Sequence, residues 1–207
     1  MMRSSSNSER TYNPADVVVF HKTREEWGAL SNMAAGFLLV VAGEEWLTAE
    51  ALYQACRFPR LPDVQRLILE QSSPMAAKMK SKPHRPQTRS DWDTARTKVM
   101  RWILRVKLGQ NLDSFRAVLE KTGASPIVER SHKDRYWGAV PGEHGNLSGQ
   151  NVLGRLLMEL REEARQRSRA ELEIVEPPPA VNDFLIFGKP VGTVRAGDRP
   201  DFPTRLL

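Results

Sequence analysis

Residues 131–161, SHKDRYWGAVPGEHGNLSGQNVLGRLLMELR, join a polar loop to an amphipathic helix. The loop contains the carboxylate of Asp134 and the ring of Trp137, and apolar residues from Val152 to Leu160 recur at helical spacing. A glycine-rich loop that enters a helix N-terminus offers free backbone N–H groups and the positive end of the helix dipole, which suits a phosphate. Together these features match the needs of a nucleotide-like substrate, although an ordinary surface loop before a core helix accounts for the same pattern.

The composition is that of a soluble globular chain, with 40% hydrophobic and 27% charged residues among 207. The formal net charge of +6 and the pI of about 9.7 favour partners that carry phosphate or other negative charge. A single cysteine, Cys56, excludes a disulfide framework and indicates a reducing compartment. The longest apolar run, residues 37–42, is too short to span a bilayer, and the N-terminus lacks the apolar segment of a signal peptide. We therefore expect a cytoplasmic protein without a membrane association.

The chain is expected to form one domain between two tails. Residues 1–15 are polar and rich in serine, which predicts disorder. Residues 16–168 carry the periodic apolar pattern of a folded domain. Residues 169–207 form a tail with a stiff proline spacer at 177–179, and this tail either folds back as an edge strand or docks on a partner.

Within the domain the pattern predicts a mainly α fold, of the α+β class, with a small sheet or hairpin in its N-terminal part. Strands are expected at 17–20 and 37–41, which can pair with each other, and a short strand at 125–130. The basic segment 80–89 contains two prolines and is predicted to be a loop. Helices are predicted from 48 to the proline at 59, then at about 63–71, from 74, and at 91–108, 112–121 and 150–167.

Several classes of catalytic site have no basis in this sequence. The four histidines are not spaced as metal ligands, and a stable metal site needs several convergent ligands. Cys56 lies on the apolar side of a predicted helix and is expected to be packed and inert. Neither a G-x-S-x-G elbow nor a Walker motif is present, so acyl transfer and P-loop chemistry are not indicated. We expect neither a metal nor a cofactor.

Two carboxylates near aromatic residues, Glu50 and Asp134, remain as candidates for chemistry. A helix-dipole role for Glu50 and a loop turn for Asp134 are the structural alternatives. Ten lysines and arginines against two acids lie between Lys78 and Lys107. This segment is a phosphate-binding wall, a nucleic-acid patch or a solvated helix face.

Taken in order, the short motifs of residues 20–163 resemble those of the NADAR, or YbiA-like, family. The matching segments are Ser31-Asn32, WLTAEALYQA at 46–55, Pro74-Met75, Trp92, Val99-Met100, Lys107, DRYWG at 134–138, GQNVLG at 149–154 and LMELR at 157–161. The chain departs from the family pattern at Ala51, where the family has histidine, and at Leu30 and Met33, where it has aromatic residues. These departures concern the identity of the substrate more than the class of reaction.

The resemblance implies an N-glycosidase that hydrolyses the bond between ribose C1 and a nitrogen. The first expectation is removal of ADP-ribose from guanine, including guanine in DNA or RNA. Hydrolysis of phosphoribosylated intermediates of riboflavin synthesis is the alternative. Because Ala51 replaces the family histidine, a module that binds ADP-ribose without cleaving it is a rival hypothesis, and a plain nucleic-acid binder is a third.

The resemblance also implies roles for individual residues. Glu50 stabilises the positive charge that develops at the ribose or activates water, and Asp134 takes the second acid–base role, although the two roles can be exchanged. Trp92 and Trp137 stack on the base or cover the sugar. Further substrate contacts are expected from Ser31, Asn32, Lys107, Gly138, Asn151, Gly154 and Arg161. Arg161 is expected to contact a carboxylate of the site or a phosphate.

Overall fold

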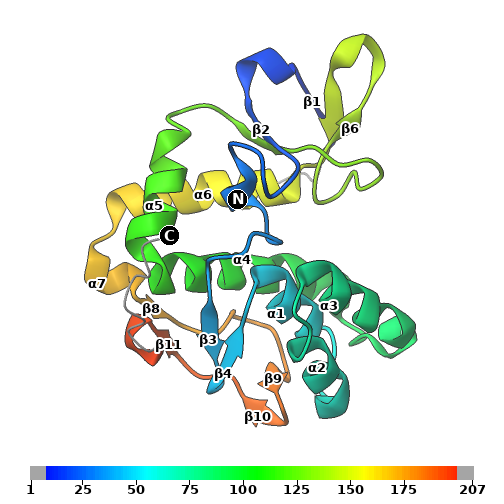
Figure 1. Cartoon of the computed structure of the whole chain (residues 1–207), viewed down its shortest axis with the longest axis vertical. Coiled ribbons are helices and arrows are strands. Elements are labelled where there is room, and N and C mark those ends of the chain that lie inside the picture. The colour runs from blue at the N-terminus through cyan, green and yellow to red at the C-terminus, as the bar shows by residue number, and fades with distance from the viewer. Residues whose placement is uncertain (1–7, 200–207) are drawn as a thin grey trace, which may run out of the picture. The chain divides into compact units, whose positions relative to one another are not determined.

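The computed structural model describes residues 8–199 of the chain, which contain seven α-helices and eleven short strands (Figure 1). The predicted mainly α class with small sheets is confirmed. The chain divides into two compact units. Unit 1 is made of residues up to 31 and 117–165, and unit 2 is made of 32–116 and the residues from 166 onward. No α-helix between residues 8 and 199 is both long enough and apolar enough to cross a bilayer.

Unit 1 contains two small sheets. In the first, β7 (Leu147–Gly149) lies between β1 (Arg10–Tyr12) and β6 (Val140–Pro141), and both neighbours are antiparallel to it. In the second, β2 (Val18–Phe20) runs parallel to β5 (Ile127–Glu129). Strand β1 forms where the sequence predicted disorder; residues 1–7 lie outside the described part of the chain.

The predicted pairing of the strands near residues 17–20 and 37–41 is wrong. Strand β3 (Leu39–Val41) pairs instead with β4 (Glu44–Trp46), which the sequence pattern did not reveal. The two strands are joined by Ala42 and Gly43, both with positive φ. Positive φ at both turn residues is the geometry of a type I′ hairpin turn, so the turn itself sets the partner of β3.

Three short helices of unit 2 pack on one another: α1 (Ala49–Ala55), α2 (Pro62–Leu69) and α3 (Pro74–Ser81). The hydroxyl of Thr48 caps α1, and the hydroxyl of Ser73 caps α3. Each cap satisfies one of the N–H groups that a helix start leaves unpaired. The caps explain why α1 starts directly after β4 and places the residue after Ala49 in its first turn.

The segment predicted to be a basic loop is largely helical. Helix α3 continues to Ser81, and a 3₁₀ helix, Lys82–Gln87, follows it. Pro83 stands in the first turn of this helix, where the missing N–H of proline carries no penalty. The sequence pattern misled because prolines were taken as breaks rather than as helix starts.

Helix α4 (Trp92–Gln110) is the longest element of unit 2, and it is followed by α5 (Leu112–Lys121). Both match their predicted positions. The amide of Gln110 bonds to the backbone N–H and C=O of Val40, which fixes β3 against the end of α4. Helix α4 therefore supports the hairpin that leads into α1.

The C-terminal residues of unit 2 also pack on α4. After α6 (Val152–Gln166) and α7 (Arg169–Leu172), the chain forms two antiparallel strand pairs. The strands are β8 (Ile174–Val175), β9 (Leu185–Ile186), β10 (Lys189–Pro190) and β11 (Val194–Arg195), paired as β8 with β11 and β9 with β10. Figure 1 shows these strands beside β3, β4 and α4. Phe184 meets the ring of Trp102 edge to face, with 4.9 Å between centroids.

Candidate functional site

Glu50 lies in the first turn of α1 and is buried. Its backbone N–H donates to the carbonyl of Asn32, at 3.0 Å, which ties the segment before β3 to the helix start. A carboxylate at this end of a helix is favoured by the dipole, as the structural alternative holds. The helix-dipole role does not explain why the Glu50 side chain is buried, because a carboxylate that serves only the dipole works equally well in solvent.

The Glu50 side chain belongs to a polar network inside unit 2. The amide nitrogen of Gln54 donates to Oε1 of Glu50 at 2.8 Å. The amide oxygen of Gln54 lies 2.9 Å from the hydroxyl of Ser81 and 3.4 Å from a guanidinium nitrogen of Arg57. Sequence patterns placed Gln54 in the matched motif without a role, and the signal for its role is the four-residue spacing from Glu50, which puts both side chains on one helix face.

The predicted base-stacking residue Trp92 lies beside this network. Its ring contacts Tyr53, with 5.1 Å between centroids, and the guanidinium of Arg57 lies 5.0 Å from the ring centre. Burial lowers the pKa of Arg57, while the ionisable groups of Tyr53 and Glu50 act in the opposite direction. The structure thus joins a carboxylate, an aromatic ring and a cation within unit 2, and Arg57 is a member that sequence analysis missed.

Asn32 also belongs to unit 2 and is buried. Its amide nitrogen contacts the sulfur of Met100 at 3.1 Å, and its amide oxygen is buried without a hydrogen-bond partner among the described residues. Ser31, its neighbour in the predicted motif, belongs to unit 1 and is buried after a 3₁₀ turn, Gly28–Leu30.

Lys107 is enclosed in the core of unit 2. Its ammonium lies 4.4 Å from the ring centre of Phe37 and 4.1 Å from that of Phe115. Burial lowers the pKa of Lys107 to about 7. The two aromatic faces attract the cation, whereas the loss of water opposes its charge. The substrate contact expected of Lys107 stays a prediction.

Asp134 makes the loop turn that was its structural alternative. Its Oδ1 accepts the backbone N–H groups of Tyr136 at 2.9 Å and Trp137 at 2.8 Å. The carboxylate is exposed, and no residue between 8 and 199 donates a hydrogen bond to its Oδ2. Asp134 therefore stabilises the loop of residues 134–138, called the tryptophan loop below. Its Oδ2 is available to bind another partner.

The start of α6 is not a free phosphate site. The N–H groups of residues 150–153 donate to carbonyl oxygens of the preceding loop, at 2.7–3.1 Å. The acceptors are Arg135, Gly138, Tyr136 and Trp137, in the order of the donors. The expectation of a phosphate at this helix N-terminus is wrong, because the loop 135–138 itself satisfies the N–H groups that the helix leaves unpaired.

Asn151, Gly154 and Gly138 fix α6 and its loop to strand β5. Asn151 is fully buried; its amide oxygen accepts the N–H of Glu129, and its amide nitrogen donates to the carbonyl of Ile127 at 2.8 Å. A Cβ at Gly154 would lie 2.1 Å from the oxygen of Ile127, and a Cβ at Gly138 would lie 2.5 Å from that of Glu129. Both glycines allow a close backbone approach that no larger residue permits.

Arg161 is buried and binds the residues that follow α5. One guanidinium nitrogen donates to the hydroxyl of Thr122 and to the carbonyl of Ser125, both at 2.8 Å. Its Nε contacts Glu162 at 3.4 Å. These bonds link α6 to the segment between α5 and β5. The contact with a carboxylate of the site or a phosphate that was expected of Arg161 stays a prediction.

The two remaining tests concern metal ligands and the cysteine. Among residues 8–199 no group of three or more His, Cys, Asp and Glu side chains is placed to hold a metal ion. Cys56 is buried, and burial raises the pKa of its thiol to about 12. At neutral pH this thiol is protonated and a poor nucleophile, as expected.

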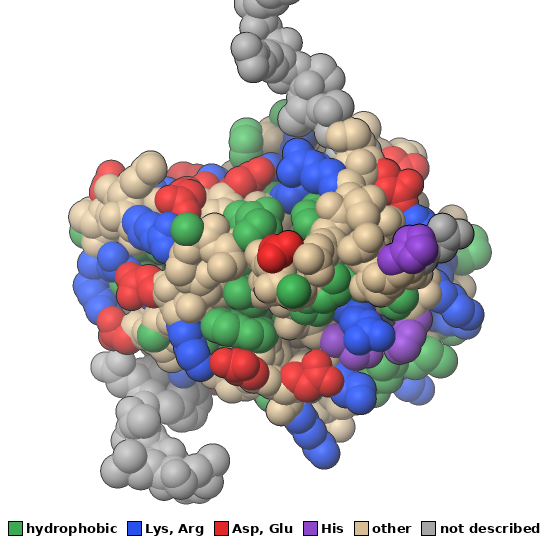
Figure 2. Space-filling view, turned by 90° about the horizontal axis from the view of Figure 1, so that it is seen from above, with side chains coloured by type: hydrophobic (Ala, Val, Ile, Leu, Met, Phe, Trp, Pro, Cys, Tyr) green, Lys and Arg blue, Asp and Glu red, His purple; other side chains and the backbone are tan. Residues whose placement is uncertain are grey.

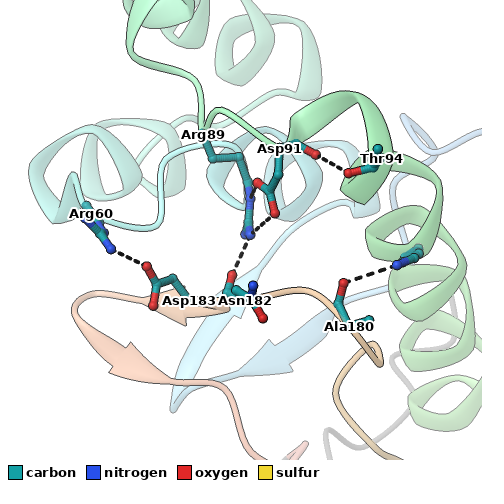
Figure 3. A network of polar contacts seen from close by, with 8 residues as sticks. Arg60, Arg89, Asp91, Thr94, Ala180, Asn182 and Asp183 are labelled. Carbon is teal, nitrogen blue, oxygen red and sulfur yellow. Dashed lines mark hydrogen bonds and ion pairs between the residues drawn. The ribbon is translucent and has the colours of Figure 1, made fainter.

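A cavity of about 400 Å³ lies elsewhere in unit 2, and its lining includes none of the predicted site residues. Figure 3 shows its polar wall. Arg89 donates to both carboxylate oxygens of Asp91 and to the carbonyl of Asn182, and Arg60 pairs with Asp183. The hydrogen bonds from Arg89 lower the pKa of Asp91. These contacts connect the C-terminal residues to the segment at the start of α4, so the polar wall of the cavity has a structural role.

The sequence model of the NADAR domain matches residues 19–165. N-glycosidase YbiA of Escherichia coli is 37% identical over 148 residues, which cover 71% of this chain and 88% of that protein. An N-glycosidase of Nostoc punctiforme is 33% identical, with coverage of 72% and 92%. A riboflavin biosynthesis protein of Vibrio vulnificus is 32% identical, with coverage of 83% of this chain and 46% of that protein.

The solved structures give the same result. The NMR structure of the Escherichia coli protein YbiA matches with a TM-score of 0.62 and 36% sequence identity. The match covers 72% of this chain and 86% of that one. Sequence motifs, domain match, relatives and fold agree, and the chain belongs to the NADAR domain family.

Proposed function

We propose that this protein hydrolyses the bond between ribose C1 and a base nitrogen, and that its substrate is guanine carrying ADP-ribose. The enzyme class rests on the relatives: those from Escherichia coli and Nostoc punctiforme are N-glycosidases, and so is this chain, a hydrolase of N-glycosyl bonds. The choice of substrate is supported by the net charge of +6, which favours a diphosphate, and by the family to which the chain belongs.

The observation that carries the proposal is the buried carboxylate of Glu50 beside Trp92 and Arg57. Breaking the C1–N bond develops positive charge on the ribose ring, and a carboxylate close to C1 stabilises that charge. The same carboxylate can take a proton from the water whose oxygen adds to C1, while the leaving base gains a proton. Partial exclusion of water strengthens both effects.

The second acid–base role is assigned to Asp134. Its Oδ1 is used by the tryptophan loop, and its exposed Oδ2 can hold a ribose hydroxyl or pass a proton to the leaving base. Trp92 and Trp137 are each proposed to stack on a flat ring of the substrate or to cover the sugar, because aromatic faces stack on bases. Ser31 and Asn32 are proposed to contact the ribose, with the unpartnered amide oxygen of Asn32 as acceptor.

A phosphoribosylated intermediate of riboflavin synthesis is the second candidate substrate. The observation that favours it is the similarity to proteins named for riboflavin biosynthesis in Vibrio vulnificus and Zea mays. This chain spans 46% of the first and 27% of the second, so the similarity concerns only part of each protein. Both candidates share the ribose C1–N bond and a phosphate, and they differ in the base.

Two non-enzymatic alternatives predict other behaviour. A module that only binds ADP-ribose leaves the glycosidic bond intact, and a plain nucleic-acid binder requires a continuous basic surface. The face in Figure 2 mixes acidic, basic and apolar side chains, without one continuous basic stripe.

The test is a product assay by mass spectrometry with two substrates, ADP-ribosylated guanosine and a phosphoribosylamine of the riboflavin pathway. Release of guanosine and ADP-ribose from the first substrate supports the proposed function, and release of the base from the second substrate alone moves the assignment to the riboflavin intermediate. Binding of ADP-ribose without turnover of either substrate supports the binding module. Binding of nucleic acid that falls steeply with salt, again without turnover, supports the third hypothesis.

A further inference from the structure

Gln54 has an environment unlike that of a glutamine that serves packing alone. It is 3% exposed, one helical turn after Glu50, and both ends of its amide bond to side chains. The nitrogen donates to the carboxylate of Glu50, and the oxygen faces Ser81 and Arg57. A buried amide with both ends engaged has one orientation, which it imposes on its partners.

Two other buried glutamines of unit 2 provide the comparison. Gln65 bonds to the backbone of Ala55, Leu185 and Phe187, at distances of 2.7–3.3 Å. Gln110 likewise bonds only to backbone groups, those of Val40 and Arg195. Both hold elements together, whereas Gln54 bonds to a carboxylate that the proposed reaction uses.

Arg57 decides which way the amide of Gln54 points. A guanidinium only donates hydrogen bonds, so the atom of Gln54 that faces Arg57 is the oxygen. The hydroxyl of Ser81 cannot decide this alone, because its single proton is shared between Gln54 and the carbonyl of Lys78, 2.8 Å away. With the oxygen turned to Arg57, the NH₂ group must face Glu50.

We propose that Gln54 is a positioning residue that fixes the orientation of the Glu50 carboxylate for cleavage of the glycosidic bond. A donor favours the charged form of a carboxylate, and the NH₂ group offers no acceptor for the proton of a neutral one. The Glu50 oxygen that Gln54 holds cannot rotate away, so the other oxygen is directed to the ribose or the water. This inference rests on the proposed catalytic role of Glu50.

The test is the pH profile of kcat for the full-length Gln54→Met variant, assayed with the substrate that the parent turns over. Methionine keeps the length and volume of glutamine but donates no hydrogen bond. We expect kcat to fall by about tenfold or more with KM within a few-fold, and the acid limb of the profile to move up by about one pH unit. A profile that coincides with that of the parent would overturn the proposal.

Gln65→Met is the matched control, since it removes an equally buried amide that bonds only to backbone. It is expected to lower the melting temperature and leave the acid limb in place. A shift of the acid limb in Gln65→Met equal to that in Gln54→Met would also overturn the proposal, because the shift would then follow from loss of packing.

If Gln54→Met does not fold, the Gln54→Glu variant tests the positioning role of Gln54 instead. Two carboxylates at hydrogen-bonding distance share one proton, so Glu50 in this variant should ionise only at higher pH. We expect activity to be lost at neutral pH and to recover at alkaline pH. Neutral activity equal to that of the parent would contradict the proposal.

Glu50→Gln separates this inference from the proposed function. If Glu50→Gln is inactive and Gln54→Met has the profile of the parent, only the positioning role fails. If Glu50→Gln retains activity within a few-fold, the catalytic assignment of Glu50 fails, and the role of Gln54 fails with it.

Discussion

At the scale of single residues, the central feature is a carboxylate that the fold keeps largely out of water. Glu50 owes its position to the cap at Thr48, to the carbonyl of Asn32 and to the amide of Gln54. None of these contacts neutralises its charge, which leaves the charge available to a cationic transition state. The stability of the fold should therefore depend little on this charge, while activity should depend on it strongly.

Glu50→Gln is expected to lower kcat by about 10²-fold or more, the usual scale for a positioned acid–base group. The melting temperature should stay close to that of the parent, because the amide has the same shape. Glu45→Gln, on the neighbouring strand and exposed, is the control and should keep full activity. A Glu50→Gln enzyme with activity within a few-fold of the parent would move the catalytic role elsewhere.

Asp134 has a structural and a proposed chemical role, and two variants separate them. Asp134→Asn keeps the acceptor for Tyr136 and Trp137, so the loop should hold and the melting temperature should not change. Its kcat should fall by about 10²-fold if the carboxylate acts on the substrate. Asp134→Ala should in addition lose stability. Full activity in Asp134→Asn would contradict the chemical role and leave Asp134 with only its structural role in the loop turn.

Because the pKa of Lys107 is lowered in the folded chain, we expect the free energy of unfolding to depend on pH in an unusual way. The pKa of Lys107 is lowered to about 7 in the folded chain and is near 10.4 in the unfolded chain. Above pH 7 the unfolded state therefore binds more protons, and the free energy of unfolding should rise with pH, by at most about 1.4 kcal/mol per unit. Below pH 7 both states are protonated, and this contribution is constant.

The measurement is urea unfolding between pH 7 and 8.5. Higher pH is avoided because the Cys56 thiol, with its pKa raised to about 12, ionises first in the unfolded chain and lowers stability above about pH 9. In Lys107→Met the rise should disappear. An equal rise in parent and variant would assign the effect to other groups.

At the scale of elements, α6 illustrates how motif residues act through packing. The family motifs around residues 134–138 and 149–154 were interpreted as substrate contacts. In unit 1 they bond to one another and to β5, and they place the tryptophan loop at the start of α6. These bonds shape the loop that carries Asp134 and Trp137, and the substrate contacts expected of Gly138, Asn151 and Gly154 stay predictions.

Gly154→Ala is expected to lower the free energy of unfolding by about 1–3 kcal/mol or more, because its Cβ would lie 2.1 Å from the oxygen of Ile127. Gly142→Ala is the control, since its Cβ would have its nearest atom at 3.7 Å, an ordinary contact. Denaturant unfolding of both variants measures the difference. Equal stability of the two variants would show that α6 can shift away from β5.

The helices could be predicted from sequence better than the strand pairs. Helices α4 and α5 have long apolar stripes and matched prediction, whereas β2 pairs with a strand more than 100 residues away. Periodicity is local, and nothing local specifies such a partner. For the same reason the sequence revealed Glu50 and Trp92 as candidates but not the Gln54–Arg57 network. That network depends on the positions of side-chain atoms in the folded chain.

At the scale of the whole molecule, the residues of the predicted site divide between the two units. Glu50, Asn32, Trp92 and Lys107 belong to unit 2, whereas Ser31, Asp134, Trp137, Gly138, Asn151, Gly154 and Arg161 belong to unit 1. The chain passes from one unit to the other between the adjacent residues Ser31 and Asn32. A sequence motif does not reveal this division, because it gives the order of residues along the chain but not the compact unit in which each residue packs.

The C-terminal residues are expected to be required for stability. Beyond residue 168, the side chains buried in unit 2 are Leu172, Val175, Val181, Phe184, Ile186, Val191 and Val194. Each buried apolar side chain contributes roughly 1.5–3 kcal/mol, against a typical total stability of 5–15 kcal/mol. Removal of residues 169–207 should therefore unfold the chain or lower its melting temperature sharply, in contrast to the separable tail that the proline spacer suggested. An unchanged melting curve would contradict this.

The most direct test of the account is to follow the reaction of the parent protein with ADP-ribosylated guanosine in H₂¹⁸O, quenched early and analysed by mass spectrometry. We expect guanosine without label, and ADP-ribose with one ¹⁸O at ribose C1, in the parent but not in Glu50→Gln. Binding of the substrate without release of guanosine, or release that Glu50→Gln supports equally well, would contradict the central claim that Glu50 drives hydrolysis of an N-glycosidic bond.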